Sequence, residues 1–253
     1  MIDAHCHLEQ KNYENDLDEV IKMCKEKGMK AVVSSCAHPR DFDRAMEIEE
    51  KYRGFVFITL GIHPEYIKEF SEDQISEYIE KIKSVKDRIV GIGEIGLDYN
   101  WVKEPDQQER QKELFRKMLR LAKELDKPVV IHSRDSHEDT FSILDEQNPE
   151  KVLWHFFGVT RLLDQIKKKG WSISLGPIIR RSKTYRKIAR DMPIEKIMLE
   201  TDSPWFEQEG QEKGYPFNVI VSAETIAKMK KLEINEVIQK TTENAIEFYN
   251  LKL

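Results

Sequence analysis

The feature that most constrains the fold is a regular alternation of short apolar runs with longer amphipathic segments along the whole chain. Each run is bounded by glycine, proline or charged residues and is too short to form a helix. Such runs are typical of buried parallel strands, whereas the amphipathic segments between them predict helices. The predicted strands are residues 2–7, 31–35, 55–60, 89–94, 128–132, 152–155, 171–175 and 197–200. The predicted helices are residues 17–26, 41–52, 72–85, 108–125, 138–146, 161–169, 183–190, 222–232 and 234–250.

Eight strand–helix units in 253 residues favour an α/β fold of the (β/α)8 TIM-barrel type, with the active site at the carboxyl ends of the strands. A doubly wound open sheet is the alternative. The first strand–helix turn, however, lacks the G-x-G-x-x-G fingerprint of many such sheets, and eight units close a barrel naturally. No proline- or serine-rich linker and no low-complexity segment divides the chain. We therefore predict a single domain over residues 1–253.

Composition limits what this domain can do. The net charge of −5 and the pI of about 5.9 argue against a protein that holds long nucleic acid on a basic surface. A polyanionic substrate would therefore have to be met locally, by metal ions or a few placed basic residues. The mean hydropathy of −0.60 and the lack of a long apolar run exclude a membrane protein.

The compartment and the partners follow from the same composition. No apolar signal-peptide core stands near the start of the chain, and the three cysteines show no C-x-x-C spacing. We therefore expect a cytoplasmic protein without disulfides. No segment indicates an obligate protein partner, and we expect a monomer.

Histidines mark the predicted strand ends. Side chains two residues apart on a strand point the same way, so Asp3, His5 and His7 share one face, and two adjacent imidazoles suit a divalent transition metal. Alone, these histidines could simply be exposed near a terminus. However, six of the seven histidines lie at or just after predicted strand ends, where a barrel places its active site. This distribution predicts a metal site. The six are His5, His7, His38, His63, His132 and His155.

Motifs at these strand ends resemble those of the TatD family of metal-dependent hydrolases, a branch of the amidohydrolase-like barrels. They occur in the family's order and extend from the first predicted strand to the last. The matching motifs are Asp3-Ala4-His5-Cys6-His7, Gly61-Ile62-His63-Pro64, Gly93-Glu94-Ile95-Gly96-Leu97-Asp98-Tyr99, His132-Ser133-Arg134, His155-Phe156-Phe157-Gly158 and Glu200-Thr201-Asp202-Ser203-Pro204.

The resemblance implies a site for one or two divalent ions, with Glu94 bridging them and Asp202 as both a ligand and the proton acceptor for the attacking water. Glu94 and Asp202 are thus the expected catalytic residues. A donor set of four histidines and two carboxylates suits Zn²⁺ or Mn²⁺ better than Mg²⁺, although the family is usually described as Mg²⁺-dependent. The implied ligands are His5, His7, Glu94, His132, His155 and Asp202.

Some of these residues also have simpler interpretations. Glu94 could be a solvated loop residue, and His132 and His155 could be hydrogen-bonded histidines of the core. The family associates the position of His63 with the substrate phosphate, but a turn histidine is the alternative. Arg134 could grip a phosphate oxygen or pair with a neighbouring acid.

The residues around the expected site are open to similar alternatives. Trp101, Trp205 and Phe206 follow predicted strand ends and could stack bases, although exposed loop aromatics often only pack the loop. Glu200 and Asp3 are expected to be structural or to orient ligands.

The function implied by the resemblance is a metal-dependent deoxyribonuclease that cleaves DNA or oligonucleotide ends in the 3′ to 5′ direction. One alternative keeps the site but hydrolyses an ester or amide, such as an aminoacyl-tRNA linkage. Another is a non-catalytic binding barrel, against which the complete ligand set argues. The loop at residues 215–219 keeps the family's asparagine but lacks the preceding basic residue and the following proline. This departure leaves the substrate preference open.

Overall fold

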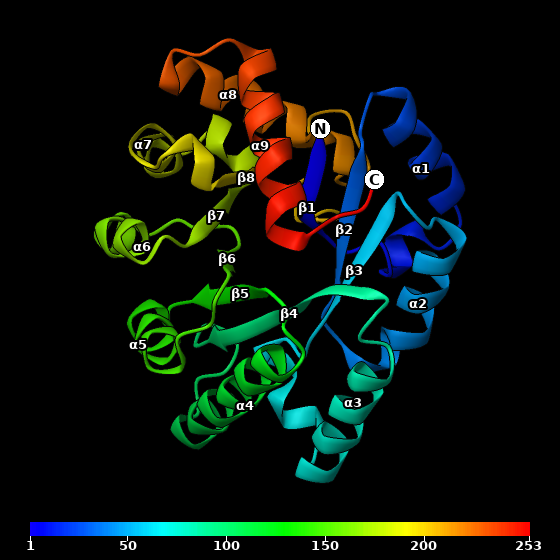
Figure 1. Cartoon of the computed structure of the whole chain (residues 1–253), viewed down its shortest axis with the longest axis vertical. Coiled ribbons are helices and arrows are strands. Elements are labelled where there is room, and N and C mark those ends of the chain that lie inside the picture. The colour runs from blue at the N-terminus through cyan, green and yellow to red at the C-terminus, as the bar shows by residue number, and fades with distance from the viewer.

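The computed structural model describes residues 1–253 and contains a single sheet of eight strands, ordered β1 to β8 as in the sequence (Figure 1). Every adjacent pair from β1–β2 to β7–β8 is parallel. The loop after β8 closes the ring against β1, because His7 N donates to Ser203 O at 2.7 Å and Asp202 N donates to His5 O at 3.0 Å. The predicted (β/α)8 barrel is therefore confirmed. The strands are β1 Ile2–Cys6, β2 Ala31–Cys36, β3 Val56–Leu60, β4 Ile89–Asp98, β5 Val129–Arg134, β6 Val152–Trp154, β7 Ser172–Leu175 and β8 Ile197–Leu199.

Helices cover the outside of this barrel (Figure 1). The last one, α9, ends beneath β1, where the Tyr249 hydroxyl donates to the Ala4 carbonyl at 2.9 Å. None of the helices combines the length and apolar character that a membrane span requires. All three cysteines are buried and free. The helices are α1 Leu17–Glu26, α2 Phe42–Lys51, α3 Glu72–Ser84, α4 Pro105–Glu124, α5 His137–Gln147, α6 Leu163–Lys169, α7 Lys183–Asp191, α8 Val219–Lys230 and α9 Ile234–Tyr249.

The strands give the barrel interior an apolar lower layer and a polar upper layer. Side chains two residues apart on a strand share a face. Four buried apolar residues therefore stand one layer below polar ones, and they belong to one apolar cluster with Phe248 and Tyr249 of α9. This cluster packs beneath the polar residues and fills the interior of the barrel, so the site is closed below by apolar side chains. The four pairs are Val33 below Ser35, Val130 below His132, Leu153 below His155 and Met198 below Glu200.

The boundary predicted for the fourth strand is wrong, because β4 continues four residues beyond Glu94 to Asp98. Its register with β5 shifts between Ile92 and Ile95, which is the mark of a bulge, and Glu94 lies within this irregularity. The glycines near Glu94 predict an early end of this strand. In the structure they instead allow the backbone of β4 to approach neighbouring strands closely. A Cβ on Gly96, whose φ is +147°, would lie 1.9 Å from the carbonyl oxygen of His132. Glu94 is thus a residue of a bulged strand, and not of a loop.

Candidate metal centre

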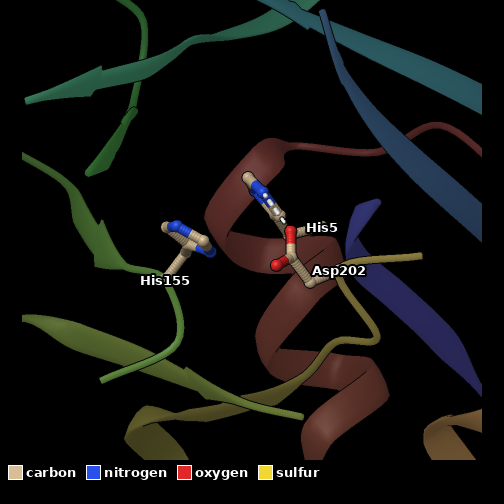
Figure 2. Close-up of side chains that lie close together, drawn as sticks. All are labelled: His5, His155 and Asp202. Carbon is tan, nitrogen blue, oxygen red and sulfur yellow. Dashed lines mark ion pairs between the residues drawn. The ribbon is translucent and has the colours of Figure 1, made fainter. Parts of the chain in front are cut away.

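Polar side chains from several strands meet at the carboxyl ends of the barrel. The imidazoles of His5 on β1 and His155 after β6 face each other with ring centroids 4.1 Å apart, and Asp202 after β8 points toward His5 (Figure 2). In each of four overlapping groups, nitrogen and oxygen atoms lie within 4.8 Å of one another. The groups are His5–His155–Asp202, His5–His7–Glu94, Glu94–His132–His155 and His63–Asp98–His132.

Glu94 lies at the centre of this constellation. Its Oε2 is 3.4 Å from His5 Nε2 and 3.6 Å from His7 Nε2. Its Oε1 is 2.8 Å from both His132 Nδ1 and His155 Nε2. Burial opposes ionisation of Glu94, but the nearby histidines outweigh it and hold the carboxyl pKa well below its usual range. The two oxygens of one buried carboxylate therefore face two separate histidine pairs.

Asp202 lies beside the two histidines of the β1 region, His5 and His7. Its Oδ1 lies 3.2 Å from His7 Nε2 and 3.5 Å from His5 Nε2. Burial opposes its charge too, but hydrogen bonding to these histidines lowers the carboxyl pKa below its usual value. The backbone of Asp202 is left-handed, with φ of +57°, a conformation that aspartate and asparagine tolerate better than most residues. This turn directs the carboxylate back over the barrel mouth.

Hydrogen bonds from β2 orient the two histidines of β1. His7 Nδ1 donates to the Ser35 carbonyl at 2.7 Å, and His5 Nδ1 bonds the Ser35 hydroxyl at 3.1 Å. Both Nε2 atoms are thereby left to face Glu94 and Asp202. His5 Nε2 is buried without a hydrogen-bond partner, although two carboxylate oxygens lie near it. An unsatisfied imidazole nitrogen between carboxylates is the donor arrangement that a divalent cation requires, so these residues fit a metal ion.

A buried carboxylate lies behind each histidine of the other pair. His132 Nε2 lies 2.8 Å from Asp98 Oδ2, and His155 Nδ1 lies 3.4 Å from Glu200 Oε2. Glu200 is itself fixed, because it accepts a hydrogen bond from Phe156 N at 2.7 Å. The hydrogen bond between His132 and Asp98 is of the kind that fixes the ring orientation of a metal-binding histidine, whereas His155 Nδ1 and Glu200 Oε2 approach each other without hydrogen-bond geometry. His132 Nδ1 and His155 Nε2 face the same oxygen of Glu94.

Residues 2–250 match the family model described as TatD related DNase. The chain belongs to the TatD related DNase family. It is 35% identical to the human protein named deoxyribonuclease TATDN3, with 98% of this chain and 94% of that protein covered. It is 32% identical to the metal-dependent hydrolase YabD of Bacillus subtilis strain 168, with 99% of each covered. The resemblance of the motifs to the TatD family is therefore confirmed.

Solved TatD structures share the fold over the whole chain. A TatD family hydrolase from Entamoeba histolytica superimposes with a TM-score of 0.90 at 24% identity and covers 100% of this chain and 98% of that one. The TatD homologue YjjV of Escherichia coli K12 gives a TM-score of 0.90 at 23% identity with the same coverage.

His63, at the TatD-like Gly-Ile-His-Pro motif, lies beside the same centre. Its Nε2 is 3.6 Å from Glu94 Oε1, and its ring packs edge-on against His132 with centroids 4.2 Å apart. Its Nδ1 accepts a hydrogen bond from Glu65 N, which leaves the proton of the neutral ring on Nε2. Burial, and then the charge of His132, lower the pKa of His63 to about 3. His63 is therefore a neutral donor at physiological pH.

Arg134 is not among the clustered residues. It is exposed at the end of β5, and its guanidinium lies 5.8 Å from the centroid of the Trp101 ring. Trp101 is 63% exposed, and Trp205 and Phe206 are also exposed after β8. These side chains belong to the outer rim of the mouth. His38 and His137 do not join the centre either, since His38 Nε2 pairs with Glu69 at 3.1 Å and His137 Nδ1 bonds Ser133 at 2.9 Å.

Asp98 is the site residue whose role the sequence did not reveal, although it stands in the matched motif. Alternation along β4 was a usable signal, because residues 94, 96 and 98 would share a face. Asp98 Oδ1 accepts hydrogen bonds from the backbone of Asn100 at 2.9 Å and Trp101 at 2.8 Å, which holds its other oxygen against His132. Asp98 therefore positions a histidine of the centre.

Replacing Asp98 by asparagine is expected to lower metal affinity or activity by about 10- to 100-fold, the usual cost of losing such a partner. The physical reason is that the amide cannot hold the His132 ring by a charged hydrogen bond. Metal titration and hydrolysis assays on the same preparation measure both quantities. Asp135→Asn is the matched control, since that exposed carboxylate only bonds Asn100. Equal behaviour of the two variants would contradict the role given to Asp98.

Proposed function

We propose that this chain is a divalent-metal-dependent deoxyribonuclease that removes nucleotides from the 3′ ends of DNA. The observation that carries the proposal is the position of Glu94, whose two oxygens face separate histidine pairs. The family description supports a DNase, and the human relative bears the name deoxyribonuclease. The name of the Bacillus subtilis relative supports a metal-dependent hydrolase.

The residues would hold the ions in two groups. His5, His7 and Asp202 would hold one ion, His132 and His155 a second, and Glu94 would contact both. Divalent ions in these positions would supply Lewis acidity toward the phosphodiester and lower the pKa of water. Four imidazoles favour Zn²⁺ or Mn²⁺ over Mg²⁺, which prefers oxygen ligands.

The protein's own groups would handle the proton and the phosphate. Asp202 is ionised, and its Oδ1 faces the centre, so it would accept the proton of the attacking water. His63 is neutral and would donate its Nε2–H to a phosphate oxygen. Arg134 and Trp101 lie further out on the rim, where they would contact the remainder of the strand.

Metal removal tests this proposal. Purified protein supplied with Mn²⁺, Zn²⁺ or Mg²⁺ is expected to shorten a 5′-labelled oligonucleotide progressively from its 3′ end. Chelator is expected to abolish the reaction, because the histidines and carboxylates alone provide no activated water. Glu94→Ala protein, purified identically, controls for contaminating nucleases. The proposal fails if DNA stays intact with every ion while an ester or amide substrate is hydrolysed.

A further inference from the structure

A run of positive charge spans the end of the loop after β7 and the first turns of α7. Residues 180–187, here called the β7–α7 basic segment, carry five cations and no acidic residue, in a chain whose net charge is −5. The cations are Arg180, Arg181, Lys183, Arg186 and Lys187. All but Arg186 are exposed, and Arg186 is half-buried.

Neighbouring carboxylates do not neutralise this segment. None of its five cations has a carboxylate within ion-pair distance, whereas the nearest cation on each side of it in sequence does: Lys169 pairs with Asp145, and Arg190 lies 2.6 Å from Asp191. Arg186 instead donates to the Arg180 carbonyl at 2.8 Å. Cations in the first turn of a helix also oppose the helix dipole. Local stability therefore does not explain the charge, and mutual repulsion within the segment would be relieved by a polyanion.

The segment is attached to the candidate metal centre. It begins five residues after the end of β7, on the rim where all strands end. Tyr185 within the segment donates its hydroxyl to the Phe156 carbonyl at 2.9 Å, and Phe156 directly follows His155. The Phe156 ring in turn stacks on exposed Phe206 with centroids 4.7 Å apart. The segment that carries the positive charge is thus joined, through Tyr185, to the residue that follows His155 and to the Phe156–Phe206 stack.

The charges around the centre favour one path for a bound strand over another. The loop after β8 carries Glu207, Glu209 and Glu212, all exposed, so it repels phosphates. A strand that leaves the centre toward α7 would instead meet five cations. Because the molecule as a whole is acidic, a polyanion needs such a local attraction to stay bound.

We propose that the β7–α7 basic segment binds the backbone phosphates of the DNA strand on the side away from the scissile bond. The enzyme therefore prefers single strands of several nucleotides over dinucleotides. This inference rests on the proposed function and adds a substrate length to it. Each cation that contacts a phosphate of a single strand contributes about 0.7 to the slope of log affinity against log salt.

The test compares two triple variants of the full-length, metal-loaded protein. Arg180→Ala/Arg181→Ala/Lys183→Ala removes three charges from the segment. Lys86→Ala/Lys123→Ala/Lys228→Ala removes three exposed charges near the ends of α3, α4 and α8, at the opposite end of the barrel, as a matched control. The substrates are a labelled single strand of about 20 nucleotides, a dinucleotide and bis(p-nitrophenyl) phosphate, with binding followed separately by fluorescence anisotropy.

Raising the salt from 50 to 200 mM is expected to raise the KM and Kd for the long strand in both proteins. The rise should be about 20-fold larger for the wild type than for the segment variant, because the variant lacks three phosphate contacts. Hydrolysis of the dinucleotide and of bis(p-nitrophenyl) phosphate should be unchanged, which separates strand binding from chemistry. The control variant should behave as wild type. Equal salt dependence of both triple variants overturns the inference. If the wild type cleaves no DNA, the proposed function fails, and the anisotropy comparison alone decides the inference by the same criterion.

Discussion

Replacing Glu94 by alanine is expected to lower both the metal content and the hydrolytic activity of the protein to the level of chelator-treated wild type. Glu94 is the one carboxylate whose oxygens face both histidine pairs, at 3.4 Å from His5 Nε2 and 2.8 Å from His132 Nδ1. Without it, two groups of imidazoles lose the charge that neutralises bound cations. The loss in activity should exceed about 100-fold, which is the largest loss usually seen when a residue that only orients a metal ligand is replaced.

Metal analysis of the purified variants, together with hydrolysis of an oligonucleotide, measures this effect. His63→Ala is the informative comparison, because His63 lies 3.6 Å from Glu94 but is given a role toward phosphate rather than metal. It should retain its metal and lose rate, by about 100-fold if it donates to the developing charge. Circular dichroism of both variants should show the same spectrum as the wild type, which would establish that the barrel is folded. Equal metal loss in the two variants would contradict the division of roles.

The barrel was predictable because its physics is local. Each buried parallel strand requires a short apolar run, and each covering helix requires an amphipathic segment, so both kinds of element can be recognised in the sequence alone. The extent of β4 was not predictable, because the glycines near Glu94 predict an interruption when considered alone. Only the neighbouring strands reveal why Gly96 is there, since its backbone lies against the carbonyl of His132.

The residues of the candidate site were likewise predictable only in part. The histidines and carboxylates could be proposed because they stand at strand ends and form an ordered set of motifs. Their orienting partners were predictable only in part: Glu200 and Asp3 were expected to be structural or to orient ligands, whereas the roles of Ser35 and Asp98 were not identified. Ser35 contributes a backbone carbonyl to His7, which has no signature in sequence, and the role of Asp98 depends on the paired register of β4 and β5. Arg134 was expected to grip phosphate, but it lies over Trp101 on the rim, and contact with phosphate stays a prediction.

Replacing Asp202 by asparagine is expected to lower kcat by about 100- to 10,000-fold, the range that a positioned proton acceptor contributes. Asparagine has nearly the same shape and tolerates the left-handed backbone at this position, where φ is +57°, so folding should be preserved. The amide is neutral, however, and cannot take a proton from the attacking water.

Steady-state kinetics, metal analysis and circular dichroism of the same Asp202→Asn preparation separate these effects. Glu200→Gln is the control, because Glu200 is buried and reaches the centre only through His155 Nδ1 at 3.4 Å. Its loss should stay within about 10- to 100-fold, since it removes an orienting contact and not the acceptor. A folded, metal-loaded Asp202→Asn protein with a kcat within a few-fold of wild type would show that another group takes the proton. Two other carboxylates of the centre have lowered pKa values, and both already contact histidines: Glu94 faces both histidine pairs, and Asp98 lies 2.8 Å from His132 Nε2. Asp202 is therefore the acceptor that we propose, because its Oδ1 faces the centre.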